Sequence, residues 1–329
     1  MKALVWPFWN ADQRRLRAGW RVVFQFVVAV ICFIATAMIV GSIYQGETQN
    51  PFFMMGGAVV QNCIFTGVII LACIFLDRRR VKDIGLNINA RWWLDLLGGL
   101  AMGAILMGII FVIQYQLGMI TLKESALSWS QILPYQIGWL VAMTFVGAGE
   151  EILSRGYQLK NLTEGFQRLG FLNGFILAAI ITSSIFGIMH ASNDNATVIA
   201  VVGIIMAGVM FCVGRICTGS LAAPIGMHIT WNYFQGAVFG FPVSGHRMQG
   251  SLISIDKTVD SPWTGGEFGP ENSFMGLIAM IVSIIIFIYW PKKKTNFKEN
   301  ILEMVRFRDR RGKSRTPTDQ VETPGILGG

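Results

Sequence analysis

Charged residues are scarce in this sequence, and their scarcity excludes an ordinary soluble domain. Only 14% of the residues are charged, whereas soluble globular domains carry about a quarter. Hydrophobic residues make up 53% of the chain, and the mean hydropathy is +0.52. With this composition, we expect the 329 residues to form an all-α protein that crosses a membrane several times.

The sequence also lacks the motifs of several other protein classes. Its five cysteines are odd in number, show no C-x-x-C pairing and lie in or beside apolar segments, so they indicate neither a disulfide nor a zinc framework. There is no internal repeat, no glycine-rich phosphate loop and no H-E-x-x-H motif. No cleavable signal peptide is evident, and we expect the first apolar segment to stay in the membrane as a signal anchor.

Long apolar segments recur up to residue 291, and each crossing of a bilayer needs about 20 such residues. They predict one transmembrane domain over residues 1–291 with about eight helices. The segments are approximately 22–42, 52–76, 93–114, 136–158, 171–190, 197–214, 219–240 and 274–290.

Lysine and arginine are distributed unevenly between the two sides of these segments. If the N-terminus is cytoplasmic, 24 of the 27 basic residues lie on the inner side, and only Lys123, Arg247 and Lys257 lie outside. This asymmetry predicts that both termini are cytoplasmic. The net charge of +8 then reflects topology and attraction to an anionic inner leaflet, and we expect no nucleic-acid partner.

Two long segments lie outside the apolar stretches. Residues 241–273 form an outer loop rich in Gly, Ser and Pro that contains His246. An irregular solvated connection is the favoured interpretation of this loop, and a lid is the alternative. Residues 292–329 begin with three lysines and end in a Thr/Pro/Gly-rich stretch, so we expect a basic, disordered cytoplasmic tail.

Two adjacent glutamates, Glu150 and Glu151, lie inside an apolar stretch, where an ionisable group is costly and usually marks a functional site. Residues four apart share a helix face, so Glu151 can pair with Arg155 while Glu150 points elsewhere. Glu150 is then free to face a cavity as a general base. Gly147 and Gly149 allow another helix to approach closely. For these residues alone, a purely structural ion pair remains the alternative.

Two histidines follow in later apolar segments. Phe186 and His190 are four apart at the end of the fifth segment, so the phenyl ring can orient the imidazole. His228 and Asn232 share one face of the seventh segment, and both side chains can donate hydrogen bonds. Alone, His190 could equally be an interfacial residue, but the polar pair on the seventh segment weakens that interpretation.

The three pieces E-E-x-x-x-R, F-x-x-x-H and H-x-x-x-N follow one another in this order on apolar segments. In this combination the chain resembles the CPBP family of CAAX-processing and bacteriocin-processing membrane proteases, also called the ABI family. That family includes the Ras-converting CAAX endopeptidases. The resemblance covers roughly residues 130–240, and it is specific as a trio because each piece alone is weak.

The resemblance implies an intramembrane endopeptidase that acts on a peptide or membrane-protein substrate. In the family, the residues that match Glu150 and His190 activate a water for attack on a peptide carbonyl. His228 and Asn232 match the pair that stabilises the oxyanion or helps to hold the site. A base, an orienting imidazole and two donors are also what amide hydrolysis by water requires.

Supporting residues and a metal are further implications of the resemblance. Glu151 and Arg155 match the supporting positions of the family motif. Glu150, His190 and His228 could bind zinc, as His₂Glu sites do, and the family is commonly labelled metalloprotease. The alternative, which we favour, is a metal-free hydrolysis that uses the same residues.

Two other functions remain open from the sequence. A transporter would also use intramembrane Glu and His, but related halves or broken helices in corresponding positions are not seen. A catalytically silent binding or immunity protein on the same fold would keep the motif residues as a structural network. In each case we expect an integral membrane protein of a bacterial plasma membrane.

Overall fold

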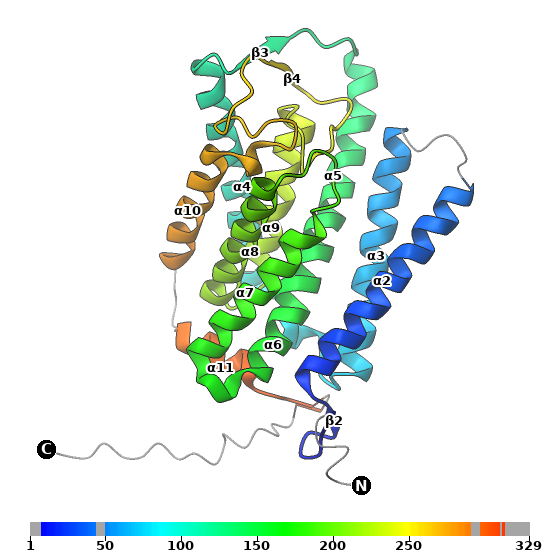
Figure 1. Ribbon diagram of the computed structural model, residues 1–329, viewed down its shortest axis with the longest axis vertical. Coiled ribbons are helices and arrows are strands. Elements are labelled where there is room, and N and C mark those ends of the chain that lie inside the picture. Colours follow the sequence, from blue (N-terminus) through cyan, green and yellow to red (C-terminus); the bar gives the residue numbers. More distant parts are fainter. Residues whose placement is uncertain (1–7, 44–49, 291–296, 310, 313–329) are drawn as a thin grey trace, which may run out of the picture.

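The computed structural model describes residues 8–43, 50–290, 297–309 and 311–312. These residues form a helical bundle with two short β-ribbons, so the expectation of a polytopic all-α protein is confirmed (Figure 1). Six helical segments of the described chain are long and apolar enough to cross a membrane. They are α2 (Ala18–Ile43), α3 (Pro51–Phe75), α4 (Ala90–Gln116), the stretch Trp129–Gly165, α7 (Phe171–Met189) and α8 (Val198–Thr218).

Shorter elements complete the bundle. α9 (Ala222–Asn232) continues into a π-helical turn, η4 (Tyr233–Val238), and α10 (Phe274–Ile288) is a short apolar helix. The remaining elements are β1 (Trp9–Asn10), β2 (Arg15–Leu16), β3 (Ile120–Lys123), β4 (Ser254–Lys257), α11 (Phe297–Val305) and the single-turn helices η1 (Val81–Ile84), η3 (Gln167–Leu169) and η5 (Pro270–Asn272).

The fourth predicted segment is much longer in the structure. It was expected at residues 136–158, but it runs without a break for 37 residues as α5 (Trp129–Glu151), the π-helix η2 (Ile152–Gln158) and α6 (Leu159–Gly165). Its inner part carries polar side chains that are buried against protein instead of lipid. Because these residues have low hydropathy, the hydropathy pattern of the sequence did not predict where this helix ends.

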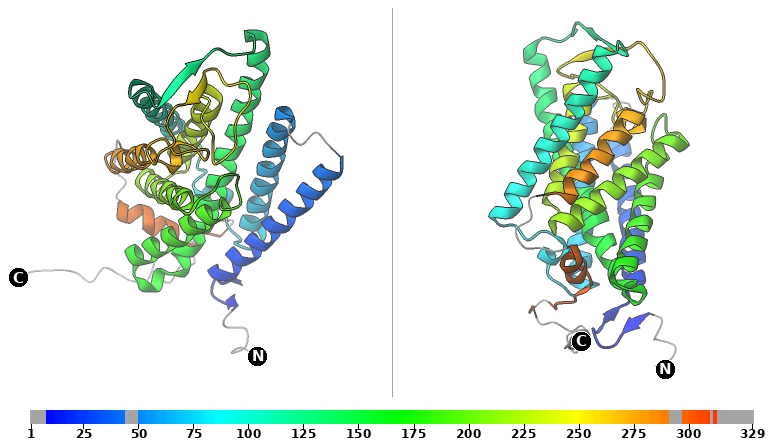
Figure 2. Two further views of the ribbon diagram at one scale, coloured as in Figure 1. Left: turned by 45° about the horizontal axis from the view of Figure 1, so that its top comes forward. Right: turned by 90° about the vertical axis from the view of Figure 1, so that its left-hand side faces the viewer.

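The outer loop packs tightly onto the bundle. Ile120 in β3 pairs with Lys257 in β4, and the loop residues Phe241 and Phe268 are buried. Figure 2 shows this loop at the end of the bundle opposite β2 and α11. Most of the segment is irregular, as expected, because only Ser254–Lys257 and Pro270–Asn272 form regular elements. The expectation of a solvated connection is wrong only for its buried residues, whose rings give the loop a fixed place.

Part of the predicted tail is also ordered. In and beside α11, Ile301, Met304 and Phe307 are buried, and the helix packs against α6, α7 and α8. The expectation of disorder is therefore wrong for residues 297–309. Residues 292–296 and 313–329, for which disorder was also predicted, lie outside the described residues.

A buried cluster of five charged side chains joins distant segments at the end of the bundle that carries β2 and α11. Glu164 contacts Arg15 at 2.5 Å, Arg21 at 2.8 Å and Arg79 at 2.5 Å. Asp77 contacts both Arg21 and Arg79 at 3.1 Å. The sequence suggested only a topological role for these arginines, but each of them is fully buried and paired with an acid.

Close contact between α4 and α9 fixes the helix that carries two of the site residues. A Cβ atom on Gly99 would lie 2.2 Å from the carbonyl oxygen of Ala223, so only glycine allows this approach. Thr230 donates a hydrogen bond of 2.7 Å to the carbonyl of Leu100. On the other side of α9, a Cβ on Gly147 would lie 2.8 Å from the Ile229 side chain, which confirms the close approach predicted there.

We expect Glu164→Gln to destabilise the protein strongly, because it leaves three buried guanidinium groups with a single acid, Asp77. Removing one partner from a buried ion pair typically costs about 3–5 kcal/mol. Thermal unfolding of the purified protein in detergent measures this loss. Glu303→Gln, in an exposed ion pair with Arg306, is the matched control. Equal stability of the two variants would contradict the role of Glu164 in stabilising the buried charged cluster.

Candidate active site

The glutamate pair lies where α5 passes into the π-helix η2. The Arg155 Nη1 atom donates to the Glu151 Oε1 atom at 2.9 Å, and both side chains are fully buried. The guanidinium also lies 4.3 Å from the ring centroid of Phe186. The Glu150 side chain is 25% exposed and faces a cavity. The division of roles predicted from helical spacing is therefore confirmed: Glu151 pairs with Arg155, whereas Glu150 points into the cavity.

His228 lies between the two carboxylates. Its Nδ1 atom is 3.1 Å from the Glu151 Oε1 atom, and its Nε2 atom is 3.8 Å from the Glu150 Oε2 atom. The imidazole stacks on the ring of Phe211 with a centroid distance of 5.0 Å. These contacts hold the ring in one orientation, with one edge toward the buried acid and the other toward the cavity.

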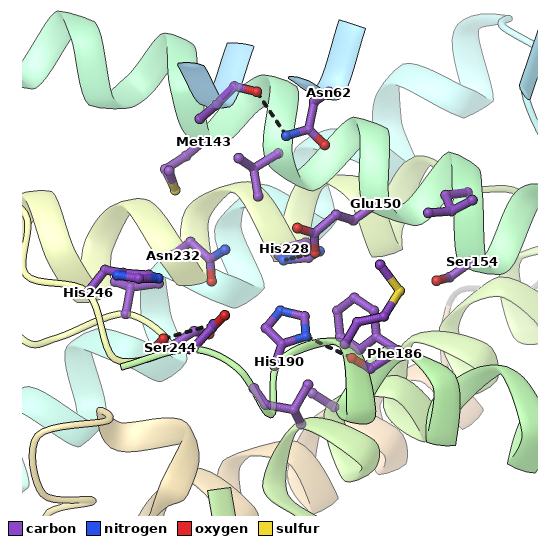
Figure 3. Close-up of a pocket in the computed structure, with 18 of the residues that line it drawn as sticks. Asn62, Met143, Glu150, Ser154, Phe186, His190, His228, Asn232, Ser244 and His246 are labelled. Carbon is purple, nitrogen blue, oxygen red and sulfur yellow. Dashed lines mark hydrogen bonds and ion pairs between the residues drawn. The ribbon is translucent and has the colours of Figure 1, made fainter. Parts of the chain in front are cut away.

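His190 caps the end of α7 and faces Glu150 and His228 from that helix (Figure 3). Its Nδ1 atom is 2.7 Å from the carbonyl oxygen of Phe186, so the N–H at this position donates to the carbonyl and leaves Nε2 for the cavity. The centroids of the Phe186 and His190 rings are 4.8 Å apart, which confirms the predicted packing of ring against imidazole.

Four of the six predicted site residues line one cavity of about 550 Å³, whereas Glu151 and Arg155 lie outside its lining. Glu150 comes from α5, His190 from α7, and His228 and Asn232 from α9 (Figure 3). Four polar groups from three apolar helices thus share one space, as expected if such groups are tolerated in a membrane only together or facing water. The alternative that His190 is an isolated interfacial residue does not hold.

Comparison with known protein families agrees with this geometry. Residues 132–234 match the family model described as Type II CAAX prenyl endopeptidase Rce1-like. The resemblance to the CAAX protease family is confirmed. The match includes every motif residue predicted from the sequence, whereas α2, α3 and the outer loop, which also line the cavity, lie outside it. Comparisons with curated proteins and with solved structures gave no match.

The side chains of this CAAX-protease-like core do not form a set of metal ligands. Within the described parts of the chain, no group of three or more His, Cys, Asp and Glu side chains is arranged to hold a metal ion. Glu150 and His228 are close to each other, but a His₂Glu zinc site needs a third ligand at the same point.

Glu271 is a cavity residue that the sequence did not reveal. It lies in η5 and accepts hydrogen bonds from the Ser244 backbone N–H at 2.5 Å, from the Ser244 hydroxyl at 3.2 Å and from the Gln235 side-chain amide. Burial raises the pKa of Glu271 to about 7. The sequence signal was a single glutamate directly before the last apolar segment, in a loop expected to be solvated.

We expect Arg155→Met to lower the yield of folded protein more than it lowers the turnover of the protein that survives. The change leaves the buried Glu151 carboxylate without its cation, and Arg155 itself does not face the cavity. Size-exclusion yield and specific activity per folded molecule measure the two effects. Arg306→Met, at an exposed ion pair, is the control. Normal yield with abolished turnover would assign Arg155 a chemical role.

We expect the folded outer loop around Glu271 to become less stable as the pH rises, because burial penalises the ionised carboxylate more than the Ser244 hydrogen bonds stabilise it. Because the folded-state pKa of Glu271 lies above its ordinary value of 4.5, the folded loop binds this proton more tightly than the unfolded chain does. The stabilisation is complete below about pH 4.5 and is lost as the pH rises through about 7. Hydrogen exchange should show the protection factor of the Ser244 amide falling by roughly tenfold or more from pH 5 to pH 8.

Glu271→Gln should abolish this pH dependence, because the amide does not ionise. The variant keeps the other ionisable side chains near the rim, among them Asp194, His246 and Arg247. An unchanged pH dependence in the variant would therefore assign the effect to those groups.

Proposed function

We propose that this protein is an intramembrane endopeptidase that hydrolyses a peptide bond with a water activated in the cavity. The observation that carries the proposal is the single cavity lined by Glu150, His190, His228 and Asn232. The match to CAAX prenyl endopeptidases over residues 132–234 supports the same type of reaction. The groups present are a carboxylate base, imidazoles and an amide donor, which is the set that amide hydrolysis by water requires.

In this proposal Glu150 is the general base. Its neighbour Glu151 is held by both Arg155 and His228, whereas the Glu150 carboxylate faces open space. His190 presents an Nε2 lone pair, because its Nδ1–H is donated to a backbone carbonyl. A water bound between Glu150 and His190 is oriented by the imidazole. It transfers a proton to the Glu150 carboxylate as its oxygen attacks the peptide carbonyl.

His228 and Asn232, one helical turn apart on α9, stabilise the oxyanion that forms. When both imidazole nitrogens carry protons, His228 donates Nδ1–H to Glu151 and Nε2–H toward the cavity. The Glu151 carboxylate stabilises the imidazolium, and Asn232 adds a neutral amide donor. The proton held by Glu150 then passes to the leaving amine. Bond cleavage thus restores the carboxylate for the next cycle.

We expect Glu150→Gln to lower turnover by about 10²–10⁴-fold, because it removes the base and preserves the shape of the side chain. The assay uses purified protein in detergent with internally quenched peptides that carry apolar residues around the scissile bond. Glu124→Gln, at an exposed position outside the cavity, is the matched control and should keep full activity. Equal cleavage with Gln at position 150 would refute the proposal.

A double substitution tests whether Glu150 and His190 act as one unit. His190→Ala alone should cause a loss similar to that of Glu150→Gln, and the double variant should lose little more. Additive losses would mean that the two residues act in separate steps.

Cleavage that depends on Glu150 also separates the endopeptidase from a silent binding protein and from a transporter, neither of which cleaves a peptide.

A further inference from the structure

The two ends of the bundle differ strongly in charge. The end that carries β2 and α11 holds most of the described basic residues. At the opposite end, Lys123 pairs with Asp256 at 3.3 Å, and Arg247 and Lys257 pair with Glu267 at 2.7 and 2.5 Å. Basic residues accumulate on the cytoplasmic side of membrane proteins. The end with β2 and α11 therefore faces the cytoplasm.

The rim of the cavity belongs to the opposite, outer end. Asn193, in the connection after α7, donates a hydrogen bond of 3.0 Å to the carbonyl of Ser244 in the outer loop. Both residues line the cavity, together with His246 and Arg247. The side chains of His246 and Arg247 are 48% and 56% exposed, so this rim is in contact with solvent. Figure 3 shows His246 and Ser244 beside Asn232, near the catalytic side chains.

Below the site, the inner part of the stretch Trp129–Gly165 is filled by buried side chains. On the stretch Trp129–Gly165, the lining residue nearest the cytoplasmic end is Ser154. Beyond it, Arg155, Tyr157 and Asn161 are fully buried, and the charged cluster around Glu164 follows. These side chains are packed against neighbouring helices and are hydrogen-bonded or ion-paired. Along this described stretch, the cavity that Glu150 lines thus ends at Ser154 and does not continue toward the cytoplasmic end.

We infer that the substrate reaches this site from the outer side of the membrane. Given the proposed function, the substrate is an exported or membrane-anchored peptide whose scissile bond lies near the outer leaflet. Phe26, Phe33, Met54 and Phe65 of α2 and α3 form an apolar wall of the cavity, so the residues beside that bond are apolar. A CAAX peptide presented at the cytoplasmic face would be on the wrong side of the membrane.

Cysteine labelling tests the side of access without any need for activity. The five native cysteines, which form no disulfide among the described residues, are first replaced by alanine or serine. Single cysteines are then placed at Arg247 on the rim, at Met189 in the cavity, and at Lys82 and Arg168 on the exposed cytoplasmic end. A membrane-impermeant maleimide is added to spheroplasts and to inverted vesicles. Size-exclusion chromatography first confirms that each variant is folded.

The inference requires that Arg247→Cys and Met189→Cys react in spheroplasts and that Lys82→Cys and Arg168→Cys react only in inverted vesicles. The reverse pattern would place the cavity on the cytoplasmic side and overturn the inference. Reaction of Met189→Cys in inverted vesicles, with Arg247→Cys reacting only in spheroplasts, would also overturn it, because the cavity would then open inward.

Sided cleavage tests the substrate class. Quenched apolar peptides are coupled to a bulky dextran carrier, which prevents them from crossing the membrane. Spheroplasts should cleave them, whereas inverted vesicles should cleave at least tenfold more slowly until detergent is added. Preferential cleavage by sealed inverted vesicles refutes access from outside. Absence of cleavage even in detergent instead refutes the proposed function, and the labelling result still decides the side of access.

Discussion

A carboxylate inside a membrane helix is stable only when cations and hydrogen-bond donors surround it, and Glu151 meets this requirement through Arg155 and His228. The Glu151–Arg155 pair holds one edge of the His228 imidazole and directs the other edge toward Glu150. It also leaves Glu150 as the carboxylate that faces open space. The orientation of His228 toward Glu150 therefore depends on an ion pair that does not itself line the cavity.

The same constraint operates at the end of the bundle that carries β2 and α11. Asp77 and Glu164 are buried there, and three arginines from different segments neutralise them. Glu164 lies on the same continuous helix as Glu150, and Arg21 lies on α2, which forms part of the cavity wall. The cluster thus ties the helix that carries the base to the helices that border the substrate space.

The outer loop completes the cavity from the other side. Ser244 is held by Glu271 and by Asn193, and the Asn193 backbone N–H in turn bonds the His190 carbonyl at 3.1 Å. The loop is therefore connected by hydrogen bonds to the turn that presents the His190 imidazole. The four polar side chains in the cavity and the loop at its rim thus come from different parts of the chain.

The sequence by itself determined the membrane class, the trio of motifs and the local pairs Glu151–Arg155 and Phe186–His190. These follow from hydropathy and from helical periodicity, which act over a few residues. Only the tertiary structure decided that His228 lies between Glu150 and Glu151, that Arg15 reaches Glu164 across 149 positions of the chain, and that Glu271 faces the cavity. The local sequence around an arginine near a membrane surface does not show whether its guanidinium contacts lipid headgroups or a buried acid. Which of these partners it meets depends on how the helices pack, and no local pattern encodes that choice.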